Sequence, residues 1–315
     1  MKVSVIIPVY NVEKYVKECV ESVMNQTLKD IEIICIHDAG TDDSWDIVKK
    51  LQKEDDRIVL LENEENVGLA ATRNVGMDKA MGKYIYFLDS DDMIKKDALE
   101  ILCKRADEEN LDVQIFGADF IYENKDLELK FRTNPRIFKG AYEDVIDGKS
   151  LFIKWMDIWD WMPSQPRFFY NRQFLADNNL RYKNQMLHED EVFTFDVLQV
   201  AQRIRVTQDE FFIRRFRESS IMTGGPTIKN VEGCIKIIDR AISAVSNEEA
   251  SEDYNKAVKF YVYKIFKDAT KKYRLAKKKL DENNAKIILS EDIKNNESRL
   301  AIFHLIESFG LWEEV

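Results

Sequence analysis

Two hydrophobic periodicities alternate along the first part of the chain. Residues 3–7 form a short β-branched run, which is typical of a strand buried on both faces. The apolar positions that follow recur every three or four residues and predict a helix, with Asn11 placed to cap it. These apolar positions are Tyr15, Val16, Cys19, Val20 and Val23.

The same alternation repeats three more times. Further apolar runs that predict strands lie at residues 31–36, 58–61 and 84–88. Helical spacing separates them, first in a segment marked by Trp45, Val48 and Leu51 and then across residues 69–81. Four alternations of strand and helix predict a parallel, doubly wound α/β sheet.

The pattern changes twice further along the chain. Between residues 112 and 223 it is mixed, with strands predicted at residues 113–116 and 211–213. After Gly224, apolar residues step by three and four along one helix face, and helical patterns continue to the end. We therefore expect three regions, at residues 1–111, 112–224 and 225–315.

Composition and charge narrow the function classes. The 315 residues carry a formal charge of −10, which argues against a nucleic-acid binder. The four cysteines are far apart and only three histidines occur, which argues against a zinc site and favours reduced thiols in a cytoplasmic protein. Neither a signal peptide nor a run of roughly 18 apolar residues is present, so we expect no membrane span.

An acidic cluster follows the fourth predicted strand. Asp89, Asp91 and Asp92 place three carboxylates within four residues, and their repulsion is relieved by a cation. Mg²⁺ and Mn²⁺ prefer carboxylate and phosphate oxygens, and in an extended segment Asp89 and Asp91 point the same way. The alternative is a solvated acidic turn in which Asp92 caps the next helix.

Three other residues near strand ends could contact a ligand, because open α/β sheets bind ligands there. Asp38 could accept a hydrogen bond from a nucleobase or simply shape a turn. Tyr10 could stack on the base or cover the end of the sheet. Arg73 lies about one turn into a helix that starts near Gly68, where it could hold a ribose, a phosphate or a structural carboxylate.

Together these segments resemble the nucleotide-binding half of the family 2 glycosyltransferases, the large inverting family with the GT-A fold. The matching stretches, in the order and spacing of the family, are residues 4–11, 38–42, 66–76 and 87–92. They cover roughly the first hundred residues. The resemblance implies a mostly parallel, Rossmann-like sheet flanked by helices, with a C-terminal helical extension. Residues 1–111 would bind a nucleotide sugar, and residues 112–224 would bind the acceptor.

The resemblance also implies residue roles. Tyr10 and Asp38 would contact the base, usually uracil, beside Pro8 in the same donor-binding stretch. Asp89 would lie near the ribose and the metal, Asp91 would coordinate Mn²⁺ or Mg²⁺, and Arg73 would lie near the base or ribose. The turn at residues 37–40 reads His-Asp-Ala-Gly where the family often has Asn or Asp, Asp, Gly, Ser, which would alter the nucleotide preference.

In the second half the resemblance rests on two shorter segments. Residues 188–193 look like the Glu-Asp motif of the family, and an inverting transfer needs a carboxylate to take the acceptor proton. The resemblance assigns that role to Asp190, with Glu189 as second candidate; the alternative is an acidic helix N-terminus. Arg215 or Arg217 would stabilise the departing diphosphate, unless they only form a surface ion pair with Glu218.

The aromatic and basic segments each allow two interpretations. Six aromatic residues could contain a sugar platform at Trp159 or Trp161, or could form core: Trp155, Trp159, Trp161, Phe168, Phe169 and Tyr170. Basic residues 271–279 follow an aromatic helix face and could lie on an anionic membrane or face solvent. The resemblance implies a growing surface glycan, either free or lipid-linked, as acceptor in a bacterial cytoplasm, and a basic segment on a membrane would place the protein at its inner face. The C-terminal helices could also form a homodimer.

Other function classes fit the sequence less well. A nucleotidyltransferase would need a glycine-rich basic loop after the first strand, and a dehydrogenase would need G-x-G-x-x-G there; residues 8–11 are neither. A non-catalytic nucleotide- or carbohydrate-binding module would be indicated by loss of a carboxylate, but Asp89, Asp91 and Asp190 are all present. An interaction protein built on the C-terminal helices would leave those carboxylates unexplained.

Overall fold

The chain folds into two compact units. The computed structural model describes residues 1–131, 138–140, 142–184, 186–218, 227–245 and 250–279. The first unit comprises Met1–Gln185 and Glu189–Ser220, and the second comprises Met186–His188 and Ile221–Val315. The predicted boundary at Gly224 lies outside the described residues.

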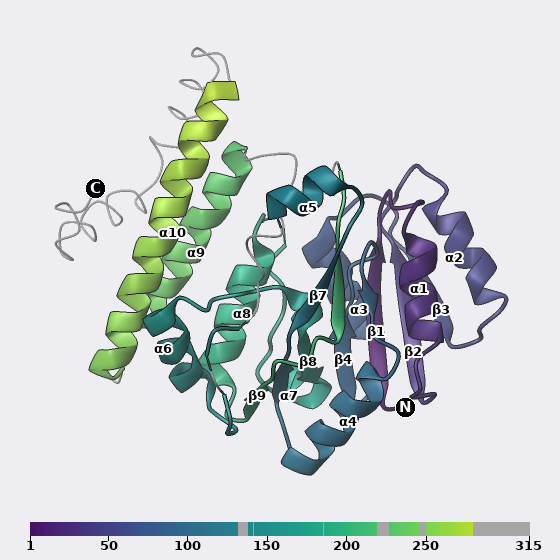
Figure 1. Ribbon diagram of the computed structural model, residues 1–315, viewed down its shortest axis with the longest axis horizontal. Helices are drawn as coiled ribbons and strands as arrows, with labels where there is room; N and C mark the ends of the chain where they lie inside the picture. Colours follow the sequence, from purple (N-terminus) through teal and green to yellow (C-terminus); the bar gives the residue numbers. More distant parts are fainter. Residues whose placement is uncertain (132–137, 141, 185, 219–226, 246–249, 280–315) are drawn as a thin grey trace. The chain divides into compact units, whose positions relative to one another are not determined.

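A seven-stranded sheet forms the centre of the first unit (Figure 1). Its strand order is β3 (Ile58–Glu62), β2 (Ile31–His37), β1 (Val3–Val9), β4 (Tyr84–Phe87), β8 (Phe168–Asn171), β6 (Val113–Ile115) and β9 (Ile204–Val206). Strands β1 to β4 are parallel, as predicted, and β8 runs antiparallel to both β4 and β6. Strands β1 and β2 are buried almost throughout, which explains their continuous apolar runs.

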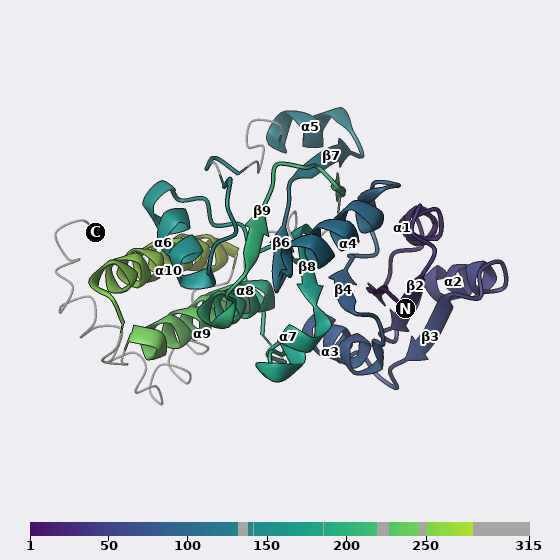
Figure 2. The same cartoon turned by 90° about the horizontal axis from the view of Figure 1, so that it is seen from below.

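Helices cover both faces of this sheet (Figure 2). Helices α1 (Val16–Met24), α2 (Ser44–Gln52) and α4 (Ala98–Glu109) share one apolar core with alternate residues of β1 and β2. Helix α3 (Leu69–Lys79) lies on the opposite face from α1 and α4, where a Cβ at Gly76 would lie 2.4 Å from Cγ2 of Ile6. The missing side chain therefore lets α3 approach β1 closely.

The predicted cap at Asn11 is wrong. Helix α1 has Tyr15 as its N-cap residue, without a side-chain hydrogen bond. Asn11 instead has a positive φ of 51°, and its Oδ1 accepts the backbone N–H of Thr41 at 2.8 Å. Asparagine tolerates the left-handed region and bonds to nearby backbone, so it ties together the loops after β1 and β2.

The rest of the first unit adds a second sheet and several helices. The three-stranded sheet has the order β5 (Met93–Ile94), β10 (Phe212–Phe216) and β7 (Ala118–Tyr122), so both strands predicted in the middle region are present, as β6 and β10. The remaining elements are α5 (Lys125–Phe131), α6 (Gly148–Ile158), the 3-10 helix η1 (Gln165–Arg167), α7 (Arg172–Asp177) and α8 (Glu189–Val200).

The aromatic stretch contributes mainly to the core. Trp155, Phe168 and Tyr170 have no measurable exposure, and Trp161 is 8% exposed. Trp159 is half-buried and ends α6 in a left-handed conformation. The core interpretation therefore holds for all of the six except Trp159.

The second unit contains two long helices, α9 (Ile228–Val245) and α10 (Glu252–Lys279), which pack side by side (Figures 1 and 2). The two helices contact each other, and their buried apolar residues include Cys234, Ile238 and Ala241 of α9 and Val258 and Tyr261 of α10. All four cysteines of the chain are buried and free of disulfides. No helix in the described ranges is long and apolar enough to cross a bilayer.

Candidate active site

The predicted donor-binding residues lie at the carboxyl ends of neighbouring strands. Pro8 is buried near the end of β1 and faces Ile36 of β2 in the register. Tyr10 follows β1 with a side chain that is 48% exposed. Asp38 follows β2, and Asp89 follows β4 on the other side of β1. Strand order thus brings segments far apart in sequence to one edge of the sheet.

Asp38 organises the turn that leads into α3. Its side chain is only 3% exposed, and Oδ1 accepts hydrogen bonds from Asn63 Nδ2 at 2.8 Å and from the N–H of Val67 at 3.0 Å. Oδ2 accepts the N–H of Gly68 at 3.0 Å, where φ is +85°. These bonds match the turn-shaping interpretation of Asp38, while base recognition by this residue stays a prediction.

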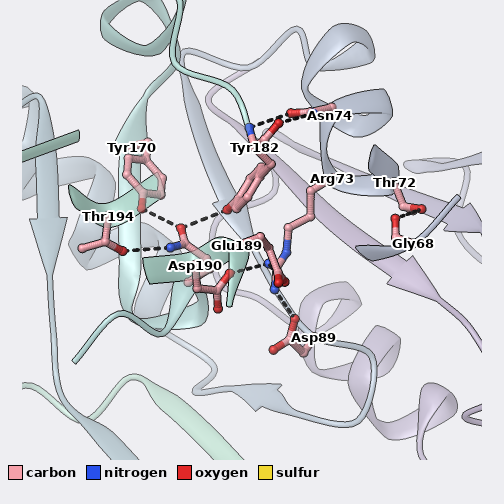
Figure 3. Close-up of polar contacts among 11 residues, drawn as sticks. Gly68, Thr72, Arg73, Asn74, Asp89, Tyr170, Tyr182, Glu189, Asp190 and Thr194 are labelled. Atoms are coloured by element: carbon pink, nitrogen blue, oxygen red, sulfur yellow. Dashed lines mark hydrogen bonds and ion pairs between the residues drawn. The ribbon is translucent and has the colours of Figure 1, made fainter. Parts of the chain in front are cut away.

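Arg73 is the cation at the centre of the site. Its side chain is 1% exposed and reaches three carboxylates, with Asp89 on one side and Glu189 and Asp190 on the other (Figure 3). The Nη2–Oδ1 distance to Asp89 is 2.8 Å, and the Nη1–Oδ1 distance to Asp190 is 2.6 Å. Of the three partners considered for Arg73, the structure places carboxylates on it, and contact with ribose stays a prediction.

The two predicted base candidates begin α8. Burial, with a smaller contribution from the nearby Glu189 and Asp89, raises the pKa of Asp190 to about 7 against the opposing effect of Arg73. Burial also raises the pKa of Glu189. The Asp190 side chain is 25% exposed and that of Glu189 is 12% exposed. A partly accessible carboxylate that titrates near neutrality suits proton transfer.

The acidic cluster after β4 is a turn. The N–H of Asp92 donates to the carbonyl of Asp89 at 3.0 Å, so the expected extended segment is wrong. Asp89 and Asp91 consequently meet different arginines. Asp92 is buried and accepts the N–H of Arg215 at 2.7 Å, whereas Asp97 is the N-cap of α4. The idea that Asp92 caps that helix is therefore wrong too.

Strand β10 and the residue after it bring two arginines to Asp91. Arg217 Nε donates to Asp91 Oδ2 at 2.6 Å, and Arg215 Nε donates to the Asp91 carbonyl at 3.0 Å. Both guanidinium groups lie over the ring of Tyr15, at 5.2 and 5.3 Å. Glu218 accepts a hydrogen bond from Asn124, so Arg217 pairs with the acidic turn instead of with Glu218.

The donor set of this turn fits a hard divalent cation that takes its other ligands from substrate. Within the described ranges, no group of three or more His, Cys, Asp or Glu side chains is arranged to hold a metal ion. Asp89 and Asp91 are nevertheless carboxylates with side chains 34% and 21% exposed. Mg²⁺ in nucleotide sites commonly binds one or two carboxylates together with phosphate oxygens and water.

Three residues of the site were not singled out from the sequence. The Tyr182 ring lies 5.2 Å below the Arg73 guanidinium, and the Asn74 side chain bonds both the N–H and the carbonyl of Tyr182. Gln165 is fully buried behind α8. Asn74 lies within a stretch that resembles the family, but nothing local marks Gln165 or Tyr182.

Comparisons with known proteins point to one family and one fold. A family model described as Glycosyl transferase family 2 matches residues 4–184. Glycosyltransferase GlyG of Streptococcus pneumoniae serotype 4 is 27% identical over 248 residues, covering 76% of this chain and 79% of that protein. The Poly(ribitol-phosphate) beta-glucosyltransferase of Bacillus spizizenii is 31% identical over 293 residues, covering 90% of this chain and 43% of that protein. Glycosyltransferase GlyA of S. pneumoniae serotype 4 is 31% identical, covering 70% of this chain and 31% of that protein.

This chain therefore spans less than half the length of two of these relatives. Among solved structures, S. aureus TarS 1-349 in complex with UDP-GlcNAc has a TM-score of 0.68 at 24% identity, covering 85% of this chain and 73% of that one. Mannosyltransferase PcManGT from Pyrobaculum calidifontis, in complex with GDP-Man and Mn²⁺, has a TM-score of 0.59 at 14% identity, covering 100% of this chain and 88% of that one. These likenesses confirm the predicted GT-A fold.

Proposed function

Because the chain belongs to glycosyl transferase family 2, we propose that it moves a sugar from a nucleotide diphosphate donor to a glycan hydroxyl with inversion at the anomeric carbon. The observation that carries this proposal is the bridge through Arg73. One buried guanidinium joins Asp89, on the donor side, to Asp190, which would act on the acceptor side. The carboxylate on the donor side, Asp89, and the proposed base, Asp190, therefore belong to one site.

The donor would be a UDP-sugar. Tyr10 would cover the base with its exposed ring, and Asp38 and Pro8 would line the same edge of the sheet. The UDP-GlcNAc complex of TarS, a structure of the same fold, supports a uridine donor. The Arg73 guanidinium would lie near the ribose on the side of its partner Asp89, while it stays paired with Asp190.

Asp190 would act as general base. As the acceptor oxygen attacks the anomeric carbon, the bond between that carbon and the diphosphate oxygen breaks, and the hydroxyl proton passes to Asp190. The pKa of about 7 keeps a substantial fraction of this carboxylate ready to accept the proton at neutral pH. Glu189 is the second candidate, and it is less exposed than Asp190.

The departing diphosphate carries the negative charge that must be stabilised. Arg215 and Arg217 lie beside Asp91, and their guanidinium N–H groups would donate hydrogen bonds to the phosphates. Asp91, with Asp89, would hold Mn²⁺ or Mg²⁺, which supplies positive charge against the diphosphate. The Mn²⁺ in the PcManGT complex supports such a site.

The acceptor would be a growing bacterial surface glycan, lipid-linked and met at the cytoplasmic face of a membrane. The similarity to a poly(ribitol-phosphate) glucosyltransferase supports an acceptor of this class. Helix α10 supports the location, because it exposes Lys259, Lys267 and Lys271 together with Phe260, which is 38% exposed. The α9–α10 pair is also the element through which two copies would associate.

A donor panel tests the proposal. UDP-, GDP-, CDP- and dTDP-sugars are incubated with wild type, Asp91→Ala and Asp190→Asn, in Mn²⁺ and in EDTA, with and without a glycan acceptor extract. We expect Mn²⁺-dependent release of one nucleotide, abolished by Asp91→Ala. Asp190→Asn should lower turnover by about a hundredfold or more while the thermal shift on donor binding persists.

Asp177→Asn, on the exposed surface of α7, is the matched charge control and should behave as wild type. Equal turnover in all variants would overturn the assigned roles. Donor-induced thermal shifts without nucleotide release or transfer in any mixture would favour the alternative, a non-catalytic nucleotide- or carbohydrate-binding module.

A further inference from the structure

A buried amide joins three segments behind the proposed base. Gln165, in η1, has no measurable exposure. Its Oε1 accepts the hydroxyl protons of Tyr170 at 2.7 Å and of Tyr182 at 2.9 Å. Its Nε2 donates to Thr194 Oγ1 at 3.1 Å. One side chain therefore connects η1 to β8, to α8 and to the segment that carries Tyr182.

Each partner of this amide is itself buried. Thr194 and Tyr170 have no measurable exposure, and Tyr182 is 3% exposed. Burial raises the pKa of both tyrosines well above the ordinary value, so both hydroxyls stay protonated and act as donors. A buried polar group without its partner is destabilising, which favours one arrangement of the four side chains.

The amide acts on α8 at one turn from the proposed base. Thr194 is four residues after Asp190 and lies on the same helix face. Phe193, on the same turn as Thr194, stacks on the Tyr182 ring with centroids 4.1 Å apart and an interplanar angle of 12°. The amide thus opposes both rotation of α8 about its axis and movement of the ring against it.

The same amide also reaches the cation that holds the base. The Tyr182 ring faces the Arg73 guanidinium, and the Tyr182 backbone is bound to Asn74, the next residue of α3. Figure 3 shows Tyr182 beside Arg73, with Tyr170 and Thr194 to the left of Asp190, on the side away from Arg73. Two routes therefore run from Gln165 to Asp190, one through α8 and one through Tyr182 and Arg73.

We propose that Gln165 is a positioning residue that fixes the carboxylate of Asp190 for proton transfer. The inference rests on the proposed role of Asp190 as base. Gln165 itself is buried and would touch neither donor nor acceptor. Its loss should therefore lower kcat, because the base is displaced, and leave donor binding unchanged.

The test compares Gln165→Met with wild type in donor and acceptor kinetics. We expect kcat to fall between about tenfold and a hundredfold, since a displacement of about 1 Å is enough for that. The KM for donor should stay within about twofold, because Gln165 does not belong to the donor site. In an Asp190→Asn background the same change should lower the residual turnover by less than about twofold, because the positioned carboxylate is already absent.

Gln114→Met is the matched control. This glutamine is also buried, at 2% exposure, but its Nε2 donates to the Leu102 carbonyl in α4. The Gln114→Met variant should have a lower free energy of unfolding but no selective loss of kcat. Gln165→Glu should recover part of the lost turnover, since a neutral buried carboxyl group accepts from both tyrosines and donates to Thr194.

An unchanged kcat in Gln165→Met, or an equal further loss in the Asp190→Asn background, would overturn the inference. If Gln165→Met does not fold, Thr194→Val decides: a fall in kcat with constant donor KM supports positioning, and wild-type kinetics refute it. If Asp190→Asn turns over like wild type, the proposed base is wrong and the failure lies there instead of with Gln165.

Discussion

At the residue scale, the buried guanidinium of Arg73 holds carboxylates from two distant parts of the chain, Asp89 and Asp190. The sequence points to Arg73, Asp89 and Asp190 because each lies in a stretch that resembles the family. It does not reveal that one guanidinium pairs with both carboxylates, since Arg73 and Asp190 are 117 positions apart. Such pairing depends on strand order and helix placement, and local pattern carries neither. The partners of Gln165 are not marked by local pattern for the same reason.

The pKa of Asp190 sets the pH dependence of turnover. A base must be deprotonated, so kcat should rise with pH through about 7, the value to which burial raises this pKa. Stability should change in the opposite sense. The folded state binds a proton at pH values where the unfolded carboxyl has already lost it, so this contribution is present below about pH 4 and is lost as pH rises through about 7.

Initial rates and urea midpoints between pH 5 and 9 measure both effects. The residual turnover of Asp190→Asn should lack the acid limb, and Asp177→Asn should keep it. An acid limb that survives in Asp190→Asn would assign the titration to another group, with Glu189 the first to examine because its pKa is also raised.

At the scale of elements, the first four strands and helices α1 and α2 follow from hydrophobic period, and α3 lies within the helix expected across residues 69–81. Hydrophobic period does not predict strand β8, because its residues belong to an aromatic stretch whose periodicity does not distinguish a strand from a core helix. Two predictions were wrong, the helix cap at Asn11 and the extended segment at Asp89, and both concern residues that lie in turns. Turn conformation depends on single residues and distant partners, here Thr41 and Arg217.

The close approach of α3 to β1 predicts a strong effect at Gly76. Gly76→Val should destabilise the protein by about 1–3 kcal/mol, since its Cβ would meet Ile6 at 2.4 Å and force the helix outward. Turnover should fall as well, because Arg73 is one turn away on the same helix. Urea unfolding and initial rates measure the two effects.

The control lies on the same helix. Lys79→Ala, at an exposed position, should change stability by no more than about 0.5 kcal/mol and leave turnover unchanged. Wild-type stability in Gly76→Val would mean that α3 is not held against β1 in the way described.

At the scale of the whole chain, charge is distributed unevenly. The net charge is −10, yet α10 exposes several lysines beside aromatic rings, with Lys267 Nζ 4.9 Å from the Tyr263 centroid. The basic run predicted from the sequence is residues 271–279, and the side chains of Arg274, Lys277, Lys278 and Lys279 lie outside the described part. The two-unit division depends on tertiary contacts. The proposed membrane contact would therefore depend on the local surface of α10, which the net charge of the chain does not locate.

If α10 lies on anionic lipid, charge reversal should release the protein. Lys259→Glu, Lys267→Glu and Lys271→Glu together should lower the partition onto phosphatidylserine-containing vesicles by a factor of at least a hundred at low salt, since each lysine contributes about 1 kcal/mol. Vesicle sedimentation measures this, and added salt should weaken wild-type binding.

The matched control reverses three exposed lysines of the first unit, at Lys49, Lys50 and Lys53. It makes the same change in net charge and should leave vesicle binding unchanged. Equal losses in both triple variants would indicate a response to net charge, and no loss in either would leave α10 without a role at the membrane.

The buried thiols give the chain built-in reporters of local opening. Cys19, Cys35 and Cys103 lie in α1, β2 and α4 of the first unit, and Cys234 lies in α9 of the second. Burial raises the pKa of Cys35 and of Cys103 to about 12, so neither forms the reactive thiolate while it is enclosed. Alkylation at each position therefore measures how often its surroundings open locally, and donor binding should slow the labelling of the thiols in the first unit, which holds the proposed donor site.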